Sequence, residues 1–319
     1  MMTIDNPYHE GELAVQQRVN ETQTADKNSR IITDRLSEKA SLFIKQQPMA
    51  IIGSLDRDGR VWASALFGEP GFLRTSEDRT LVLDLSQSRT DAADPLWRNL
   101  EDSPNVGLLV IDLTSRRRLR VNGRARRLSE SSYAIDVERA YPNCPKYIQR
   151  RQWQIPAAGT AGTVAVGRCG EALTQTQRNL IAGADTFFVA SAHPKHGVDA
   201  SHRGGRSGFV RVLDEQHLRI PDYVGNSMFN TLGNFISYPR AGLVFIDFEN
   251  SRILQLTGRA EILWELDDPA EETGGTRRFW QFEIEAWRNS ILPFRLDWEF
   301  LDYSPFIPTQ AAQTGAPDR

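Results

Sequence analysis

The sequence lacks the features that mark several specialised classes of protein. It has only two cysteines, Cys144 and Cys169, which are too few for a disulfide scaffold and have no metal-ligand spacing. No apolar run approaches the length that spans a bilayer, so no membrane partner is expected. The first residues show neither the basic nor the apolar segment of a secretory signal, and we therefore expect a cytoplasmic protein.

The sequence also lacks an excess of positive charge. Its 38 Lys and Arg residues face 41 Asp and Glu residues, which gives a formal net charge of −3. A protein that coats nucleic acid is normally basic, so nucleic acid is not the expected partner. Hydrophobic residues at 40% and charged residues at 25% are typical of a soluble globular protein. The 319 residues are enough for two separate cores.

An internal repeat is the main feature that is present. Residues 104–128 align without a gap on residues 239–263, at an offset of 135 positions and with 11 of 25 residues identical. Upstream, residues 51–74 align on residues 188–211 at an offset of 137. A period of this length is that of a domain, whereas solenoid units run to tens of residues. We therefore predict two related domains.

Each copy shows short alternating segments separated by tight turns. In the first copy this pattern predicts six strands, with a seventh candidate at 133–140, and the six are expected at 49–55, 60–67, 72–75, 80–85, 106–112 and 117–128. One or two short helices accompany the strands in each copy. Many short strands with tight turns favour an antiparallel sandwich or barrel.

These patterns divide the chain into five segments. A polar lead-in at 1–32 precedes the first copy at 33–140, and a connector helix with a Gly/Ala/Thr-rich linker occupies 141–170. The second copy, with an aromatic C-terminal extension, spans 171–305. Residues 306–319 have the composition of a flexible tail.

Several motifs resemble those of a known family. The segments NTLGN and LTGRA, together with the strand–strand–helix–strand–strand order, resemble the pyridoxamine 5′-phosphate oxidase-like superfamily of flavin-binding split β-barrels. The stretches GNSMFNTLGN, HRGGRSGFVRV and CPKYIQRRQW are similar to predicted flavin-nucleotide-binding proteins of this superfamily. The resemblance implies a mainly β chain of two tandem six-stranded antiparallel split β-barrels, which form an internal pseudo-dimer with FMN at the interface.

The resemblance also implies a function. An FMN-dependent oxidoreductase that acts on a small-molecule substrate and takes electrons from a reduced nicotinamide or another donor is the leading hypothesis, with FAD or a deazaflavin as alternative cofactors. A non-catalytic flavin-binding, sensing or electron-transfer module is the alternative function. The basic phosphate-binding run of the true oxidase is replaced here by residues 224–228, so activity on pyridoxamine phosphate is not expected. A homodimer in addition to the internal pseudo-dimer is left open.

The end of one strand in the second copy carries candidate cofactor-binding residues, which are His202, Arg203, Gly204, Arg206 and Ser207. Glycine allows a close backbone approach to a ligand, and an arginine can bind a phosphate with two hydrogen bonds. The alternative is a glycine-rich turn whose arginines are solvated.

A second group of candidates precedes a predicted helix and consists of Asn226, Ser227, Asn230 and Thr231. The start of a helix favours anions, so these residues are expected to bind phosphate or ribityl oxygens. The alternative is capping of that helix, for which Asn and Ser are favoured. The matching segment of the first copy carries Asp91 and Asp94, which would repel a phosphate.

The connector supplies a third group, Lys146, Arg150 and Trp153, which can reach a flavin held by the second copy. Here the alternative is a packing helix whose charges face water. A run of arginines follows residue 115, and alternation places Arg118, Arg120, Arg124 and Arg126 on one strand face. We interpret that face as solvated or paired with acids, with phosphate or nucleic-acid binding as the alternative.

Two histidines three positions apart, His193 and His196, suggest a metal site, but they coincide with a hairpin of the first copy, and we interpret them as a turn. The sequence contains no evident acid pair or nucleophile–base set. Flavin chemistry needs neither, because the cofactor itself carries the electrons.

Overall fold

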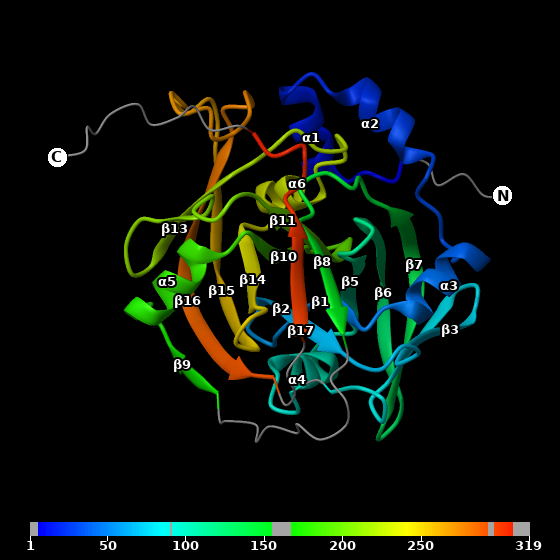
Figure 1. The fold of residues 1–319 in the computed structure, drawn as a ribbon. Coiled ribbons are helices and arrows are strands. Elements are labelled where there is room, and N and C mark those ends of the chain that lie inside the picture. Colours follow the sequence, from blue (N-terminus) through cyan, green and yellow to red (C-terminus); the bar gives the residue numbers. More distant parts are fainter. Residues whose placement is uncertain (1–5, 90, 155–166, 293–296, 309–319) are drawn as a thin grey trace.

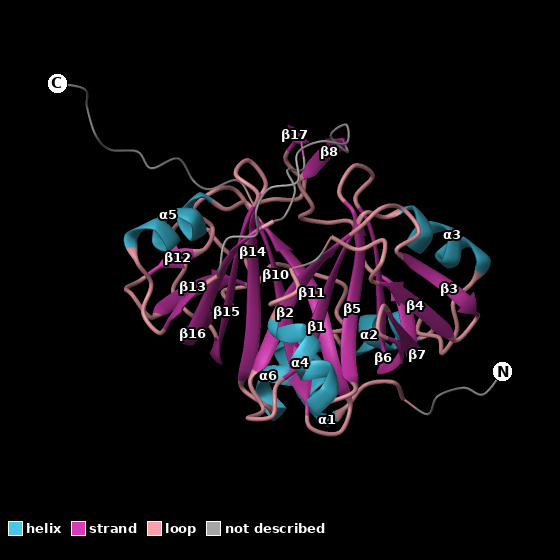
Figure 2. Cartoon of the chain, turned by 90° about the horizontal axis from the view of Figure 1, so that it is seen from below, coloured by secondary structure: helices cyan, strands magenta, loops and turns pink. Residues whose placement is uncertain are grey.

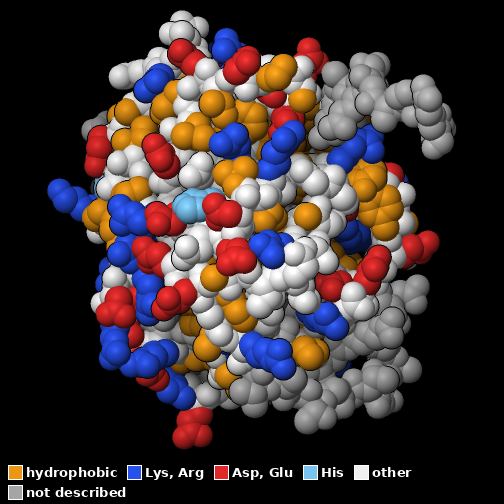
Figure 3. Space-filling model, turned by 90° about the vertical axis from the view of Figure 1, so that its left-hand side faces the viewer, with side chains coloured by type: hydrophobic (Ala, Val, Ile, Leu, Met, Phe, Trp, Pro, Cys, Tyr) orange, Lys and Arg blue, Asp and Glu red, His pale blue; other side chains and the backbone are white. Residues whose placement is uncertain are grey.

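The computed structural model describes residues 6–89, 91–154, 167–292 and 297–308, and these form a mainly β structure with two large antiparallel sheets (Figure 1). No helix in these ranges has the length and apolar character needed to cross a membrane. Acidic and basic side chains are interspersed over the face in Figure 3, in keeping with the small net charge.

The first half of the chain builds a seven-stranded sheet in the order β2-β1-β5-β6-β7-β4-β3. Its strands are β1 (Met49–Leu55), β2 (Val61–Phe67), β3 (Leu73–Glu77), β4 (Thr80–Asp84), β5 (Asn105–Asp112), β6 (Arg117–Ser129) and β7 (Ser132–Pro142). Two helices accompany the sheet, α3 (Glu38–Gln46) and α4 (Pro95–Asp102). The apolar face of α3 contributes Phe43 and Ile44 to the core of this half, as the helical spacing predicts.

The second half repeats this arrangement in the order β11-β10-β14-β15-β16-β13-β12. Its strands are β10 (Thr186–His193), β11 (Gly197–Gly204), β12 (Arg211–Val212), β13 (His217–Pro221), β14 (Arg240–Asp247), β15 (Arg252–Leu263) and β16 (Phe279–Ile291). Helices α5 (Gln175–Gly183) and α6 (Asn230–Ser237) correspond to α3 and α4. The identical strand order confirms the predicted duplication, and Figure 2 shows the two sheets spreading to either side of the centre.

Two details differ from the expected elements. Each sheet has seven strands in its path instead of six, because the seventh candidate at 133–140 is β7 and its counterpart is β16. The connector helix is not found among the described residues. Arg150–Gln154 form strand β8 instead, which pairs with β17 (Asp297–Asp302), and β9 (Arg168–Gly170) pairs with β16.

The N-terminal residues, expected as a polar lead-in, contain helices α1 (Glu10–Arg18) and α2 (Thr22–Ser29). Helix α1 packs on α6 of the second half at a glycine pair, since a Cβ on Gly11 would lie 2.2 Å from the carbonyl oxygen of Gly233. Tyr8 and Met228 are buried together beneath these helices. Helix α1 is therefore part of the second half's structure.

A third apolar cluster joins the halves. It contains Ile51 and Val61 from the first half and Phe188 and Val198 from the second, all of them buried. Glycine makes this contact close. A Cβ on Gly107 would lie 2.3 Å from the carbonyl oxygen of Val198, and one on Gly242 would lie 2.6 Å from that of Val61. Gly107 and Gly242 are matched by the sequence repeat, as are Val61 and Val198, so the interface is pseudo-symmetric.

We expect Gly107→Ala to destabilise the protein by roughly 1–3 kcal/mol, since the new methyl group meets a backbone atom that cannot move aside as a side chain can. Chemical denaturation measures this loss. Gly183→Ala is the control, because a Cβ there meets nothing within 4 Å. Equal stability of the two variants would contradict the close approach of the halves.

Candidate functional site

A cleft between the halves brings most of the predicted site residues together. It lies where β6 of the first half meets β11 and the start of α6 of the second, and connector residues 143–147 line one side. The space within it measures about 870 Å³, including the part open to solvent. Cofactor sites are concave and are often found where two domains meet.

Eight of the predicted residues line the cleft, namely Lys146, His202, Arg203, Gly204, Asn226, Ser227, Asn230 and Thr231. They come from three segments far apart in the sequence: the connector, the end of β11 and the loop that leads into α6. The sequence pattern thus identified the segments that form the cleft.

Three predicted residues do not line it. Arg206 and Ser207 lie in the exposed turn after β11, where Arg206 stacks 4.9 Å from the ring of Tyr303 and Ser207 donates to the carbonyl oxygen of Gly183 at 3.0 Å. Arg150 forms an ion pair with Asp302 across the two-stranded sheet of β8 and β17. The backbone of Trp153 belongs to β8, and its side chain lies outside the described residues.

Two arginines that we interpreted as part of a solvated or acid-paired face lie in the cleft instead. Arg120 is only 4% exposed and donates to Asn230 Oδ1 at 2.6 Å, and it pairs with Asp199 at 3.3 Å. Arg118 donates from Nε to the carbonyl oxygen of Cys144 at 2.8 Å. The solvated interpretation is wrong for both residues, and pairing with an acid holds for Arg120.

Coverage by the second half explains why the arginine run divides. Leu119, Val121 and Ala125 all lie in the core of the first half, so the alternation of β6 is unbroken and the four arginines share the opposite face. Arg118 and Arg120 contact the second half on this face, whereas Arg124 and Arg126 are exposed. Alternation indicated the common face, but the surface of the second half that covers part of it was not visible in the sequence.

Positive charge in the cleft exceeds the negative charge beside it. Asp199 pairs with Arg120, and Asp222 pairs with Arg203 at 3.2 Å. Among the described residues no carboxylate lies within 4 Å of Arg118 or of Lys146, which also lines the cleft. Burial lowers the pKa of Arg118 to about 10, so the side chain is still charged at pH 7. A partly buried cation without a carboxylate partner is less well solvated than one in water, and an anionic ligand would relieve that cost.

The start of α6 adds backbone donors to these cations. The helix begins after Phe229, which has a left-handed backbone (φ 58°) and provides no side-chain cap. Ser227 is also left-handed, at φ 62°. Such backbone is unusual for residues other than glycine and is concentrated at functional sites. The predicted capping by Asn226 or Ser227 is therefore not found, and the first amides of α6 are open to an anion.

Aromatic side chains form another part of the lining. The rings of Tyr147 and Tyr223 lie 4.8 Å apart, and Tyr147 OH donates to the carbonyl oxygen of Val224 at 2.9 Å. Phe229 lies in the same lining. The cleft thus combines an anion-binding part with an aromatic surface.

Comparison with known families finds a match in the first half of the chain. Residues 36–161 match the family model described as pyridoxamine 5′-phosphate oxidase. This part of the chain belongs to the pyridoxamine 5′-phosphate oxidase-like superfamily. No curated protein matches the chain.

Several solved structures are similar to part of this chain. A putative pyridoxamine 5′-phosphate oxidase from Lactobacillus delbrueckii is 20% identical over 37% of this chain and 94% of its own, with a TM-score of 0.30. HupZ from Group A Streptococcus is 17% identical over 41% and 98%, with a TM-score of 0.28. A pyridoxamine 5′-phosphate oxidase-related, FMN binding protein from Nostoc punctiforme is 10% identical over 40% of this chain and 92% of its own, with a TM-score of 0.25.

The pseudo-symmetric position, where β15 faces β2, has different chemistry. By the repeat, the positions of Arg118 and Arg120 are taken by Ile253 and Gln255, and those of His202 and Arg203 by Ala65 and Leu66. All four replacements are buried. The cationic lining of the first cleft therefore has no counterpart here.

Side chains tie the halves together at this second position. Gln255 Nε2 donates to Asp94 Oδ2 at 3.1 Å, and Ser64 Oγ donates to the other oxygen of the same carboxylate at 2.6 Å. Arg288 forms an ion pair with Asp91. Asp91 and Asp94, which the sequence suggested would repel a phosphate, instead cross-link the two halves.

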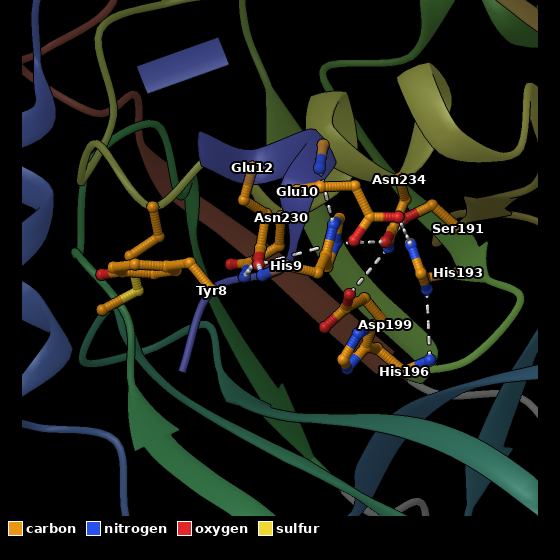
Figure 4. A network of polar contacts seen from close by, with 12 residues as sticks. Tyr8, His9, Glu10, Glu12, Ser191, His193, His196, Asp199, Asn230 and Asn234 are labelled. Atoms are coloured by element: carbon orange, nitrogen blue, oxygen red, sulfur yellow. Dashed lines mark hydrogen bonds and ion pairs between the residues drawn. The ribbon is translucent and has the colours of Figure 1, made fainter. Parts of the chain in front are cut away.

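A polar network lies behind the first cleft and includes α1 (Figure 4). Asn230, which accepts from Arg120, donates to Glu12 Oε1, and Glu12 Oε2 accepts from the backbone N–H of His9 at 2.9 Å. The His9 ring contacts Asn234 Oδ1 at 3.0 Å. Asn234 then donates to Asp199 at 2.7 Å, which closes a ring of contacts through Arg120. Burial raises the pKa of Glu12 to about 8.

The histidines beside this network are not arranged for a metal. Ligand atoms of His9, Glu10 and His193 lie within 4.8 Å of one another. However, Nδ1 of His9 accepts from the backbone of Gly11, and Nδ1 of His193 accepts from two backbone N–H groups of the turn. Each Nε2 therefore carries the proton and has no lone pair to offer. The interpretation of residues 193–196 as a turn is confirmed.

We expect the His9 contribution to the docking of α1 to weaken in acid. Burial lowers the pKa of His9 to about 4, so this contribution is complete above pH 6.5 and is lost, by about 3 kcal/mol, as the pH falls towards 4. Glu12 acts in the opposite direction, because its raised pKa of about 8 stabilises the fold increasingly as the pH falls towards 4.5. Hydrogen exchange of residues 10–18, corrected for the intrinsic pH effect, in the wild type and in His9→Gln separates the two contributions. The wild type should lose stability relative to His9→Gln between pH 6.5 and 4, and the control His217→Gln should follow the wild type, whereas a difference between wild type and His9→Gln that does not change with pH would refute the role of His9.

Proposed function

We propose that the chain binds a flavin nucleotide, FMN in the first place, in the cleft between its halves and uses it as an oxidoreductase of small molecules. The observation that carries this proposal is the pair of unpaired cations, Arg118 and Lys146, beside the uncapped start of α6. A phosphate monoester with about two negative charges suits that part of the cleft. The family match of residues 36–161 supports the same cofactor class.

The residues present fit both ends of such a cofactor. Arg118, Lys146 and the first amides of α6 would hold the phosphate, and Tyr147 and Tyr223 would provide the aromatic surface for the ring. Arg120 is already saturated by protein acceptors, so we assign it to holding Asn230 and β11 in place. When bound, a flavin supplies one- or two-electron transfer, and the protein contributes binding, orientation and electrostatics.

The absorption spectrum of the purified protein, before and after addition of FMN, tests the cofactor assignment. Oxidation of a reduced nicotinamide with quinones or nitro compounds as acceptors then tests the enzymatic part. Tight FMN binding without turnover would support the non-catalytic flavin module instead. A protein that takes up no flavin would contradict the proposal.

We expect Arg118→Ile to weaken FMN binding at least about tenfold, because a charge-assisted hydrogen bond to the phosphate is lost. The change introduces the residue found at the matching position, Ile253, and so suits a buried environment. Riboflavin, which has no phosphate, should bind both proteins equally. Arg126→Ile, an exposed change on the same strand, is the control, and similar FMN affinity in all three proteins would contradict the assigned phosphate site.

We expect one FMN per chain, because the second position lacks the cations and is closed by the contacts of Gln255 and Arg288. A fluorescence titration at protein concentrations well above the dissociation constant gives this number. Two equivalent sites would show that the cross-linked position opens in solution.

A further inference from the structure

His202 is a buried polar side chain in the cleft that has no hydrogen-bond partner among the residues that the structure describes. It lies on β11 and is 5% exposed, yet neither Nδ1 nor Nε2 reaches a donor or acceptor. Its ring packs edge-on against Phe188, with the centroids 5.5 Å apart. Buried polar groups in native proteins are normally hydrogen-bonded, so two free ring nitrogens at a cleft wall indicate a ligand contact.

Packing does not explain a histidine at this position. The matching residue of the first half is Ala65, which lies in the apolar cluster between the halves. The strand geometry around the two residues is the same, since His202 pairs with Phe188 and Ala65 with Ile51. A small apolar residue therefore satisfies the fold at this point, and the imidazole has another purpose.

The groups facing His202 are mainly cationic. Arg118 reaches it from β6, where Nη1 donates to the His202 carbonyl oxygen at 3.4 Å, and Arg203 follows it on β11. The charged and titratable residues around the ring and in the cleft are Arg118, Arg120, Cys144, Lys146, Tyr147, Arg151, Arg203, Asp222 and Tyr223. Of the cations, Arg120, Arg151 and Arg203 each have a carboxylate partner.

We propose that His202 contacts the phosphate group of the bound flavin nucleotide as an imidazolium, so that the chain takes up a proton when the cofactor binds. This rests on the proposed function. The His202 ring would then bind the phosphate together with Arg118 and Lys146. Unlike these two cations, the ring would be positively charged only while the cofactor is bound.

The electrostatics of the cleft agree with this assignment. Burial, and then the charges of Arg118, Arg203 and Arg151, lower the pKa of His202 well below its ordinary value, so the ring is neutral at pH 7 in the free protein. A bound dianion offsets the same positive charges and favours the protonated ring. Binding and protonation are therefore linked, and affinity should rise as the pH falls.

Calorimetric titration with FMN in two buffers of different ionisation enthalpy, at pH 7.5, counts the protons taken up. The wild-type protein is expected to take up a fraction of a proton for each FMN bound, and this fraction should approach one as the pH is lowered towards 7. The dissociation constant for FMN should fall by up to about tenfold for each unit by which the pH is lowered. His202→Ala, which introduces the residue found at the matching position, and His202→Gln, which keeps hydrogen-bonding capacity without titrating, should both lose this uptake. His217→Ala, at a half-exposed histidine on β13, should retain it.

Riboflavin distinguishes the two ends of the cofactor and is expected to bind without proton uptake. Equal proton uptake in the wild type and both His202 variants would overturn the proposal. Proton uptake by the wild type that is the same with riboflavin as with FMN would also overturn it. Either result would leave flavin binding itself established. Failure of the wild type to bind FMN would instead refute the proposed function. Because His202→Gln retains a polar side chain, unchanged affinity for riboflavin in that variant shows that the cleft is still folded.

Discussion

The contact of backbone with backbone at Gly107 and Gly242 is the constraint on which the rest of the structure depends. At each point a strand of one half passes so close to a strand of the other that only a hydrogen fits between them. This fixes the spacing of the halves and places β6 beside β11, where the cleft forms. Because interiors are close-packed, a shift of the halves would be felt in the cleft as well as in the apolar cluster between them.

The pseudo-symmetric frame creates two equivalent positions, and the two have diverged in opposite directions. Beside β11 the lining residues are cations and an imidazole without a hydrogen-bond partner among the described residues. Such groups lower the stability of the fold but favour the binding of an anion. Beside β2 the same positions hold Ile253, Gln255 and Ala65, and a cross-link through Asp94 replaces the opening. One position thus stabilises the pair of halves, which allows the other to keep an uncompensated charge.

Much of this could be predicted from the sequence, since the repeat implied matching sheets and the polar residues at 202–204 and 226–231 do line the cleft. Phosphate binding by Arg118 was only the alternative interpretation of its strand face, because its role depends on a surface more than 80 residues away in the chain. Local patterns carry no information about that surface. Arg206 and Ser207 were misplaced for the converse reason, because they continue a motif beyond the point where the strand ends at Gly204.

Helix α1 resolves a difficulty that the buried guanidinium of Arg120 raises. A single carboxylate, Asp199, faces this side chain, and an incompletely satisfied network would be worse than an apolar core. Asn230 can accept from Arg120 through Oδ1 only if its Nδ2 group points away from Arg120. Glu12 accepts a hydrogen bond from that Nδ2 group and so holds the amide in this orientation. The orientation of Asn230, and with it the first turn of α6, is therefore set from the N-terminal end of the chain. A segment that contributes no residue to the cleft thus determines how its anion-binding donors are presented.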